Sequence, residues 1–149
     1  LAADRPGRAV DNPRQIAPYR YSRRYGPLPP CFARATVIHP PHGAPLALVG
    51  GTASIVGEQS VHPGDLERQT DETLTNLAAL LRAAGMPEHS SALAAFRDVR
   101  VYFPDPRRVD ELRVLLKNAF PGAESIEWVR ADICRAELLV EIEGVAELA

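Results

Sequence analysis

The hydrophobic residues of this chain recur with two different spacings, which predict a succession of strands and helices. The strand-like stretches, rich in β-branched, aromatic and other apolar residues, are 31–39, 46–55 and 96–103. A helical spacing of i, i+3, i+4 and i+7 follows the second stretch and is carried by Leu74, Leu77, Ala78 and Leu81. After the third strand, a second helical stripe is formed by Val109, Leu112 and Leu116.

Turn and cap residues mark the ends of these elements. Proline and glycine fill 40–45, which predicts a hairpin turn between the first two strands. Asp65 occupies an N-cap position before a helix that is expected to continue to Ala84, and Gly85 suits the residue after its end. Asp105 and Pro106 together predict the start of the second helix, as cap and first helical residue.

Two glycines interrupt the second strand. Gly50 and Gly51 predict either a β-bulge or a close approach by a ligand or another backbone. Thr52 and Ser54 come directly after them and share one strand face. Their hydroxyls are either donors for a bound group or ordinary polar groups of a strand surface.

The segment from residue 125 to 145 predicts the last two strands. In the first, the apolar face with Val129, Ala131 and Ile133 is expected to face the core. The opposite face is mixed and consists of Ile126, Trp128, Arg130, Asp132 and Cys134. In the second strand, Leu138 to Val145, the apolar positions Leu138, Val140 and Ile142 alternate with Leu139, Glu141 and Glu143.

The predicted order is therefore β-β-α-β-α-β-β, an α+β sandwich with two helices on one face of a mixed sheet. Two helices cover one face only, so we expect the other face to be covered by self-association. Residues 1–31, rich in arginine, proline and tyrosine, predict an extended arm with at most a short strand at 19–21. Residues 32–149 then form the folded domain.

Composition narrows the possible functions. The 149 residues carry a net charge of −2, which does not favour nucleic-acid binding, and no apolar run is long enough to span a membrane. The two cysteines, Cys31 and Cys134, do not form a disulfide framework and favour a reducing cytoplasm. We expect no metal, because the histidines lack the spacing of metal ligands; they are His39, His42, His62 and His89.

The polar residues of the last two strands are the best candidates for chemistry. Glu141 and Glu143 are two positions apart in the strand, so their side chains lie on the same side of it, about 7 Å from each other. Neighbouring carboxylates raise one pKa, as a general acid at neutral pH requires. Each candidate also has a purely structural interpretation: Glu141 as a surface glutamate, Cys134 as a small packing residue and Arg130 as half of an ion pair.

Longer segments resemble known families. The element order, with GDLERQTDETLTNLAALLRAAG and LLVEIEGVA, resembles the RidA/YjgF-like (chorismate-mutase-like) fold, which is a homotrimer with clefts between subunits. The segments NPRQIAPYRYSRRYGPLPPCFARA, GTASIVG and RADICRAELLVEIEGV resemble the chorismatases. This second resemblance covers nearly all of the chain but only about the C-terminal half of a typical chorismatase.

The resemblance implies hydrolysis of chorismate to pyruvate and a hydroxybenzoate, of the 3-hydroxybenzoate type, or a dihydroxycyclohexadiene acid, in secondary metabolism and without a cofactor. It implies Glu141 as the general acid and Cys134 as a thiol that determines the product. Substrate carboxylates are expected to bind the arm and the adjacent strands. The residues expected there are Tyr19, Arg20, Arg24, Ala53, Ser54 and Arg130.

Two departures from these families leave alternatives open. The imine deaminases of the RidA family carry an arginine early in the penultimate strand, where this chain reads AESIEW. Glu58 stands where a chorismatase would be expected to have a histidine. The alternatives are a deaminase of 2-imino acids or enamines, and a non-catalytic domain for ligand binding or trimerisation, with the arm as a subunit-docking segment.

Overall fold

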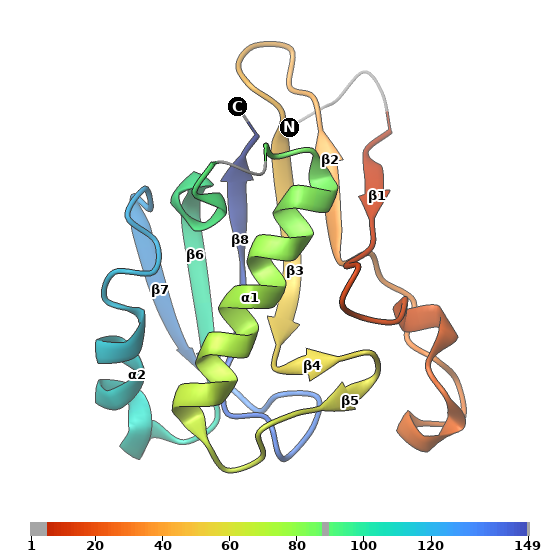
Figure 1. Cartoon of the computed structure of the whole chain (residues 1–149), viewed down its shortest axis with the longest axis vertical. Helices are drawn as coiled ribbons and strands as arrows, with labels where there is room; N and C mark the ends of the chain where they lie inside the picture. Colours follow the sequence, from red (N-terminus) through yellow and green to blue (C-terminus); the bar gives the residue numbers. More distant parts are fainter. Residues whose placement is uncertain (1–5, 88–89, 149) are drawn as a thin grey trace.

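A computed structural model describes residues 6–87 and 90–148, so His89 lies outside the described residues. Its centre is a six-stranded mixed sheet in the order β1-β2-β3-β8-β6-β7 (Figure 1). The strands are β1 (Arg8–Val10), β2 (Ala35–Ile38), β3 (Leu46–Ala53), β6 (Phe96–Phe103), β7 (Ser125–Arg130) and β8 (Glu141–Glu147). Only β6 and β7 are parallel, and the other neighbours are antiparallel. A small hairpin of β4 (Ile55–Val56) and β5 (Gln59–Ser60) follows β3.

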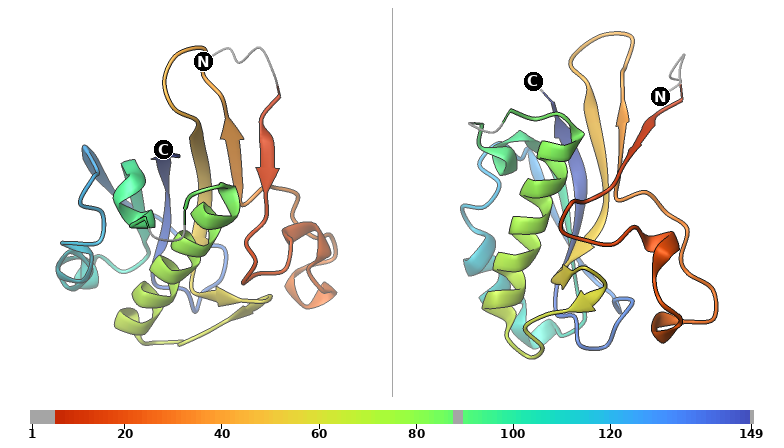
Figure 2. Two further views of the ribbon diagram at one scale, coloured as in Figure 1. Left: turned by 45° about the horizontal axis from the view of Figure 1, so that its top comes forward. Right: turned by 45° about the vertical axis from the view of Figure 1, so that its right-hand side comes forward.

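The helices α1 (Leu66–Ala84) and α2 (Val109–Leu116) lie on the same face of the sheet, as Figure 2 shows. The α1 boundaries are those that the sequence predicts, because the Asp65 carboxylate accepts a hydrogen bond from the Arg68 N–H and Gly85 ends the helix with φ 120°. The predicted α+β class, with two helices on one face of a mixed sheet, is confirmed. The core lies between this face and the helices.

The core is assembled from the positions that the hydrophobic pattern marks. Leu77, Leu80 and Leu81 of α1 are fully buried, and they belong to the same apolar cluster as Val99 and Val101 of β6. Leu112 and Leu116 of α2 complete the layer over the other end of the sheet. The predicted apolar side of β8 is also confirmed, since Ile142 and the preceding Leu138 and Val140 are fully buried.

The prediction for 125–134 is wrong in two respects. The strand β7 ends at Arg130, because its parallel partner β6 ends opposite it at Phe103. Cys134 therefore lies in a loop, and β8 begins only at Glu141, between β3 and β6. The two faces of β7 are also exchanged, because Ile126 and Trp128 pack against the core.

The arm contains more regular structure than its composition indicates. The strand β1 pairs with β2 at the edge of the sheet, and two short 3₁₀ helices follow, η1 (Pro18–Arg20) and η2 (Arg23–Tyr25). The proposed strand at 19–21 is absent, because Pro18 begins a 3₁₀ turn in which the Tyr21 N–H donates to the Pro18 carbonyl. Two further 3₁₀ turns, η3 (Ala92–Ala95) and η4 (Pro106–Arg108), flank β6, and η4 takes the predicted start of the second helix.

The glycine pair in β3 forms the expected bulge. The pairing with β8 shifts register between Val49 and Thr52, so Gly50 and Gly51 have no regular partners. Within the described residues, no helix is both long enough and apolar enough to cross a membrane.

Candidate active site

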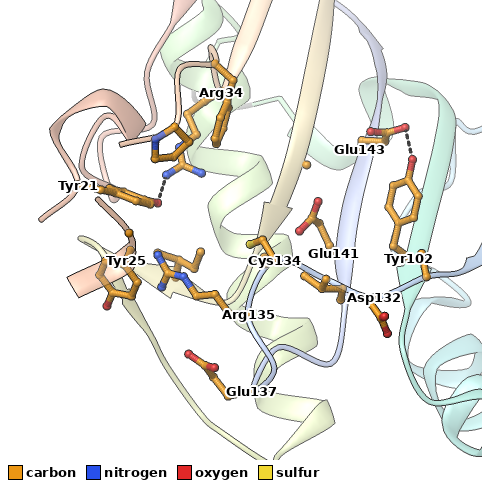
Figure 3. Close-up of a pocket in the computed structure, with 18 of the residues that line it drawn as sticks. Tyr21, Tyr25, Arg34, Tyr102, Asp132, Cys134, Arg135, Glu137, Glu141 and Glu143 are labelled. Atoms are coloured by element: carbon orange, nitrogen blue, oxygen red, sulfur yellow. Dashed lines mark hydrogen bonds between the residues drawn. The ribbon is translucent and has the colours of Figure 1, made fainter. Parts of the chain in front are cut away.

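A pocket of about 790 Å³ opens where β3 ends and β8 begins. One side is formed by the strand ends and by the loop 131–140. The other side is formed by η2 and the residues around Arg34 (Figure 3). The volume falls in the range of small-molecule sites, which is roughly 300–1,000 Å³. The pocket therefore joins the arm, the bulge and the catalytic candidates, although these are far apart in the sequence.

Glu141 contributes a carboxyl group to this pocket. It is the first residue of β8 and pairs with Ala53 of β3 on one side and Tyr102 of β6 on the other. Its side chain passes over Gly51, where a Cβ atom would collide with the Glu141 carboxyl group. Burial raises the pKa of Glu141, and the nearby Glu143 carboxylate raises it further. The glycine bulge thus leaves room for a carboxyl group that retains its proton more readily than an exposed glutamate.

Glu143, two residues further along β8, is held in a charged network. Its Oε1 accepts hydrogen bonds from the Tyr102 hydroxyl at 2.7 Å and from Arg100 Nη1 at 2.8 Å. Arg100 also pairs with Glu127 at 2.6 Å. The carboxyl groups of Glu141 and Glu143 therefore have different environments: Glu143 is hydrogen-bonded to Tyr102 and Arg100, and Glu141 is not.

Cys134 lines the pocket from the loop 131–140 and remains accessible to solvent. Burial raises the pKa of the Cys134 thiol, and the nearby Glu141 carboxylate raises it further. The Arg135 guanidinium acts in the opposite direction and lowers this pKa. The loop is fixed from below by Gln69 of α1. The Gln69 amide donates to the Glu137 carbonyl at 2.8 Å and accepts from the Leu139 N–H at 2.8 Å.

The wall opposite Glu141 is cationic and aromatic. Arg34 is 3% exposed, and its guanidinium donates to the Tyr21 hydroxyl and lies 5.2 Å from the centre of the Phe32 ring. Arg135 extends from the loop 131–140 toward this wall and lies 3.8 Å from the centre of the Tyr25 ring. Among the described residues, no carboxylate forms an ion pair with Arg34, and its Nε has no hydrogen-bond partner. A buried guanidinium without a counterion is costly, so this wall suits an anionic ligand.

The structure brings together four of the predicted site residues. Glu141, Cys134, Arg24 and Ala53 line the pocket.

The other predicted site residues lie outside this pocket. Ser54 is fully buried and its hydroxyl donates to the Val61 carbonyl at 2.9 Å. Tyr19 is 52% exposed, with the Arg20 guanidinium beside its ring. Arg130 is exposed at the end of β7. Of the two carboxylates that could pair with it, Asp132 and Glu143, the second is bound by Arg100 instead.

No protein-family model matches the chain. A 3-hydroxybenzoate synthase from Streptomyces hygroscopicus is 37% identical in an alignment of 144 residues that covers 91% of this chain and 42% of that protein. A chorismatase crystal structure superposes with a TM-score of 0.83 at 32% identity, over 93% of this chain and 43% of the other. The chain is homologous to chorismatases.

The match to the chorismatases spans less than half of their length. The fold itself is that of the YjgF/RidA proteins. A member of the YjgF/YER057c/UK114 family from Mycobacterium tuberculosis superposes with a TM-score of 0.58 at 26% identity, over 78% of this chain and 86% of that one.

Sequence reasoning missed several residues of this pocket. Arg34 was part of a predicted strand with no distinguishing feature, and its burial arises because the arm folds back over it. Arg135 stood in an expected turn between two strands. Tyr102 was one of the polar positions of β6, and its link to Glu143 depends on β8 lying next to β6. The alternation of arginine and tyrosine in PYRYSRRY is a signal that could have pointed to Tyr21 and Tyr25. In the described part of the chain, no cluster of acidic, histidine or cysteine side chains is arranged to bind a metal ion.

Proposed function

We propose that this chain catalyses the hydrolysis of chorismate, releasing pyruvate and a hydroxybenzoate or the corresponding dihydroxycyclohexadiene acid. The observation that carries the proposal is the position of Glu141. Its carboxyl group, with a raised pKa, lies in a pocket beside an accessible thiol and opposite a buried guanidinium that lacks a counterion. The homology to a 3-hydroxybenzoate synthase supports the same reaction.

The first step is proton transfer to carbon. The enolpyruvyl ether of chorismate accepts a proton from Glu141 at its methylene carbon, which leaves an oxocarbenium ion stabilised by the ether oxygen. Water adds to this cation, and the resulting hemiketal breaks down to pyruvate and a dihydroxycyclohexadiene acid. A protonated carboxyl group is required at the start, so the raised pKa of Glu141 serves this step.

Formation of an aromatic product needs one further loss of water from the ring. Cys134 is placed to act here, because its thiol lines the same pocket as Glu141. Attack of the sulfur on the ring displaces a hydroxyl group, and elimination of the thiol then restores Cys134 and gives the hydroxybenzoate. Water is added in the first stage and lost in the second, so the overall reaction to pyruvate and hydroxybenzoate is balanced.

The cationic wall provides for the carboxylates of the substrate. Arg34 and Arg135 join the predicted Arg24 as candidate ligands, with hydroxyl groups from Tyr21 and Tyr25 beside them. Ala53, opposite Glu141 in the sheet, forms the floor. Four of the predicted substrate-binding residues do not line this pocket, so their binding role stays a prediction; they are Tyr19, Arg20, Ser54 and Arg130.

The proposal includes an assembly. Both α-helices of the described residues lie on one face of the sheet, and the other face carries none (Figure 2). We infer that other copies of the chain cover that face, and a homotrimer in a reducing cytoplasm is the arrangement that we propose.

The deciding experiment is incubation of the purified chain with chorismate, with pyruvate and aromatic products measured by chromatography. Glu141→Gln should lower pyruvate release by about 10³-fold or more, because the amide has no proton to donate. Glu67→Gln makes the same chemical change on the exposed side of α1 and should leave the rate unchanged.

Other outcomes point to the alternatives. Release of ammonia from 2-imino acids, with no pyruvate from chorismate, would identify a deaminase of the RidA type. Binding of 3-hydroxybenzoate without turnover of either substrate would identify a non-catalytic ligand-binding domain.

A further inference from the structure

The distal part of the arm, residues 17–30, is attached to the molecule without a hydrophobic core of its own. No described residue between 11 and 34 belongs to the apolar clusters. Tyr19 is 52% exposed and Leu28 is 82% exposed. Even so, this segment supplies Tyr21, Arg24 and Tyr25 to the pocket. Polar contacts must therefore hold it in place.

Glu58, in the turn between β4 and β5, provides the most direct of these contacts. Its Oε2 accepts a hydrogen bond from the Ser22 N–H at 2.8 Å, and its Oε1 accepts one from the Ser22 hydroxyl at 2.8 Å. Ser22 is the residue that begins η2. The two bonds thus fix the start of the short helix that carries Arg24 and Tyr25. Hydrogen bonds from Ser22, with help from Arg135, lower the pKa of Glu58, so the accepting carboxylate form persists at neutral pH.

The same turn also positions Arg135. Its Nη1 donates to the Glu58 carbonyl at 2.8 Å and to the Ser60 hydroxyl at 3.0 Å. Held in this way, the guanidinium lies 3.8 Å from the centre of the Tyr25 ring and 5.4 Å from that of Tyr21. Gln59, the residue after Glu58, makes a further contact with the arm, because its Oε1 accepts a hydrogen bond from Arg24 Nη1 at 2.9 Å. The β4–β5 turn is therefore hydrogen-bonded both to the arm and to Arg135 of the loop 131–140.

We propose that Glu58 is a positioning residue that holds the arm against the β4–β5 turn, so that Tyr21, Arg24 and Tyr25 complete the wall of the ligand pocket. Glu58 does not itself line the pocket. Its carboxylate determines whether η2 stays in place, and thereby how well an anionic aromatic ligand is bound. The part of this inference that concerns substrate rests on the proposed function, whereas the attachment of the arm does not.

The attachment is tested by limited proteolysis with trypsin. The arm offers cleavage sites at Arg20, Arg23 and Arg24, which are exposed. Cleavage requires local opening, so its rate reports the population of the detached arm. Glu58→Ala should raise the initial rate of arm cleavage about fivefold or more, because two charge-assisted bonds are lost. Glu124→Ala, an exposed glutamate remote from the pocket, is the matched control and should leave the rate unchanged.

Ser22→Ala is a second variant that removes only the hydroxyl bond and should give a smaller increase in the same direction. The affinity for 3-hydroxybenzoate, measured by calorimetry, should fall about fivefold in Glu58→Ala. If chorismate is turned over, KM should rise by a similar factor while kcat changes less than about twofold, since Glu141 is untouched. Circular dichroism should show an unchanged folded domain.

Equal cleavage rates for wild type and Glu58→Ala would overturn the proposal. Faster cleavage with unchanged benzoate affinity would overturn the claim that the arm forms the pocket wall. Neither measurement depends on turnover, so a failure of chorismate hydrolysis alone would count against the proposed function and not against this role of Glu58.

Discussion

At the scale of single residues, the site is defined by what surrounds one carboxyl group. Glu141 and Glu143 differ by two positions in one strand, yet only Glu143 receives hydrogen bonds from Tyr102 and Arg100. The Arg34 guanidinium lowers the pKa of Glu141, but burial and the Glu143 carboxylate outweigh it, so the pKa stays above the usual glutamate value. A carboxyl group with a raised pKa is the kind that can act as a general acid near neutral pH.

The raised pKa of Glu141 has a consequence for stability. The folded protein binds this proton more tightly than the unfolded chain, so the free energy of unfolding decreases as pH rises from the ordinary glutamate range through the raised pKa. Glu141→Gln removes that decrease. The variant should therefore be more stable than wild type at pH 7 and similar to it near about pH 4. Urea unfolding at both pH values measures this, and a less stable variant at pH 7 would contradict it.

Gly51→Ala should separate activity from folding. The added methyl group collides with the far end of the Glu141 side chain, which can rotate away. We expect a cost of no more than about 1 kcal/mol in unfolding free energy, but at least a tenfold loss of pyruvate release, because the acid is displaced. In a Glu141→Ala background the same substitution should have no stability cost. An active Gly51→Ala enzyme would show that the observed carboxyl position is not required.

Cys134→Ala should change the product and not the first step. Pyruvate release depends on Glu141, so its rate should stay within about threefold of wild type, while the share of hydroxybenzoate falls and that of dihydroxycyclohexadiene acid rises. Cys31→Ala, at the other free thiol, is the control. An unchanged product ratio would remove the thiol from the mechanism.

At the scale of elements, the loop 131–140 depends on α1. Gln69 is fully buried, and its amide bonds the carbonyl groups of His62 and Glu137 and the N–H of Leu139. These bonds fix both the segment that leads into α1 and the segment that leads into β8. A single helix side chain therefore sets the position from which Cys134 and Glu141 enter the pocket.

Gln69→Ala should lower the free energy of unfolding by about 2–3 kcal/mol, because three partly buried backbone groups lose the partner that a fully buried side chain gave them. Thr75→Ala, on the exposed side of the same helix, should cost less than about 0.5 kcal/mol. Thermal or urea unfolding compares the two. Equal costs would mean that the loop is held by other contacts.

The elements also show how far the sequence could be interpreted. The ends of α1 were predictable because Asp65 and Gly85 act locally, and β6 was predictable from its alternation. The end of β7 was not, because it depends on where its partner β6 stops. Glu141 and Cys134 were identified through resemblance and strand spacing, whereas Arg34 and Arg135 reach the pocket through contacts with distant segments. Local chemistry was visible in the sequence, and long-range placement was not.

At the scale of the whole molecule, one side of the sheet is covered by helices and the other is not (Figure 1). Leu48 is 38% exposed on the uncovered side, next to its strand partner Val145. Around them, Arg100, Glu127 and Glu143 form a charged network on the same side. An apolar centre with charged neighbours is the composition of a protein interface.

We predict that light scattering will give three times the mass of the chain. Leu48→Arg should reduce this mass to that of a monomer, because a charge would enter the centre of the interface. Val114→Arg, at a position on α2 that is 74% exposed, should leave the mass unchanged. A monomeric wild type would contradict the homotrimer.

The position of β8 between β3 and β6 has a further consequence, which concerns the order of assembly. The central strand is the last one in sequence, so the hairpin β2–β3 and the pair β6–β7 share no common sheet until residues 141–147 enter between them. During synthesis, a nascent chain that still lacks these residues has two unjoined half-sheets, and the long-range closure makes folding slow. Because Glu141 is the first residue of that strand, the acid enters the pocket in the same event that completes the sheet. If the proposed function holds, an incomplete chain would therefore be inactive until residues 141–147 have joined the sheet.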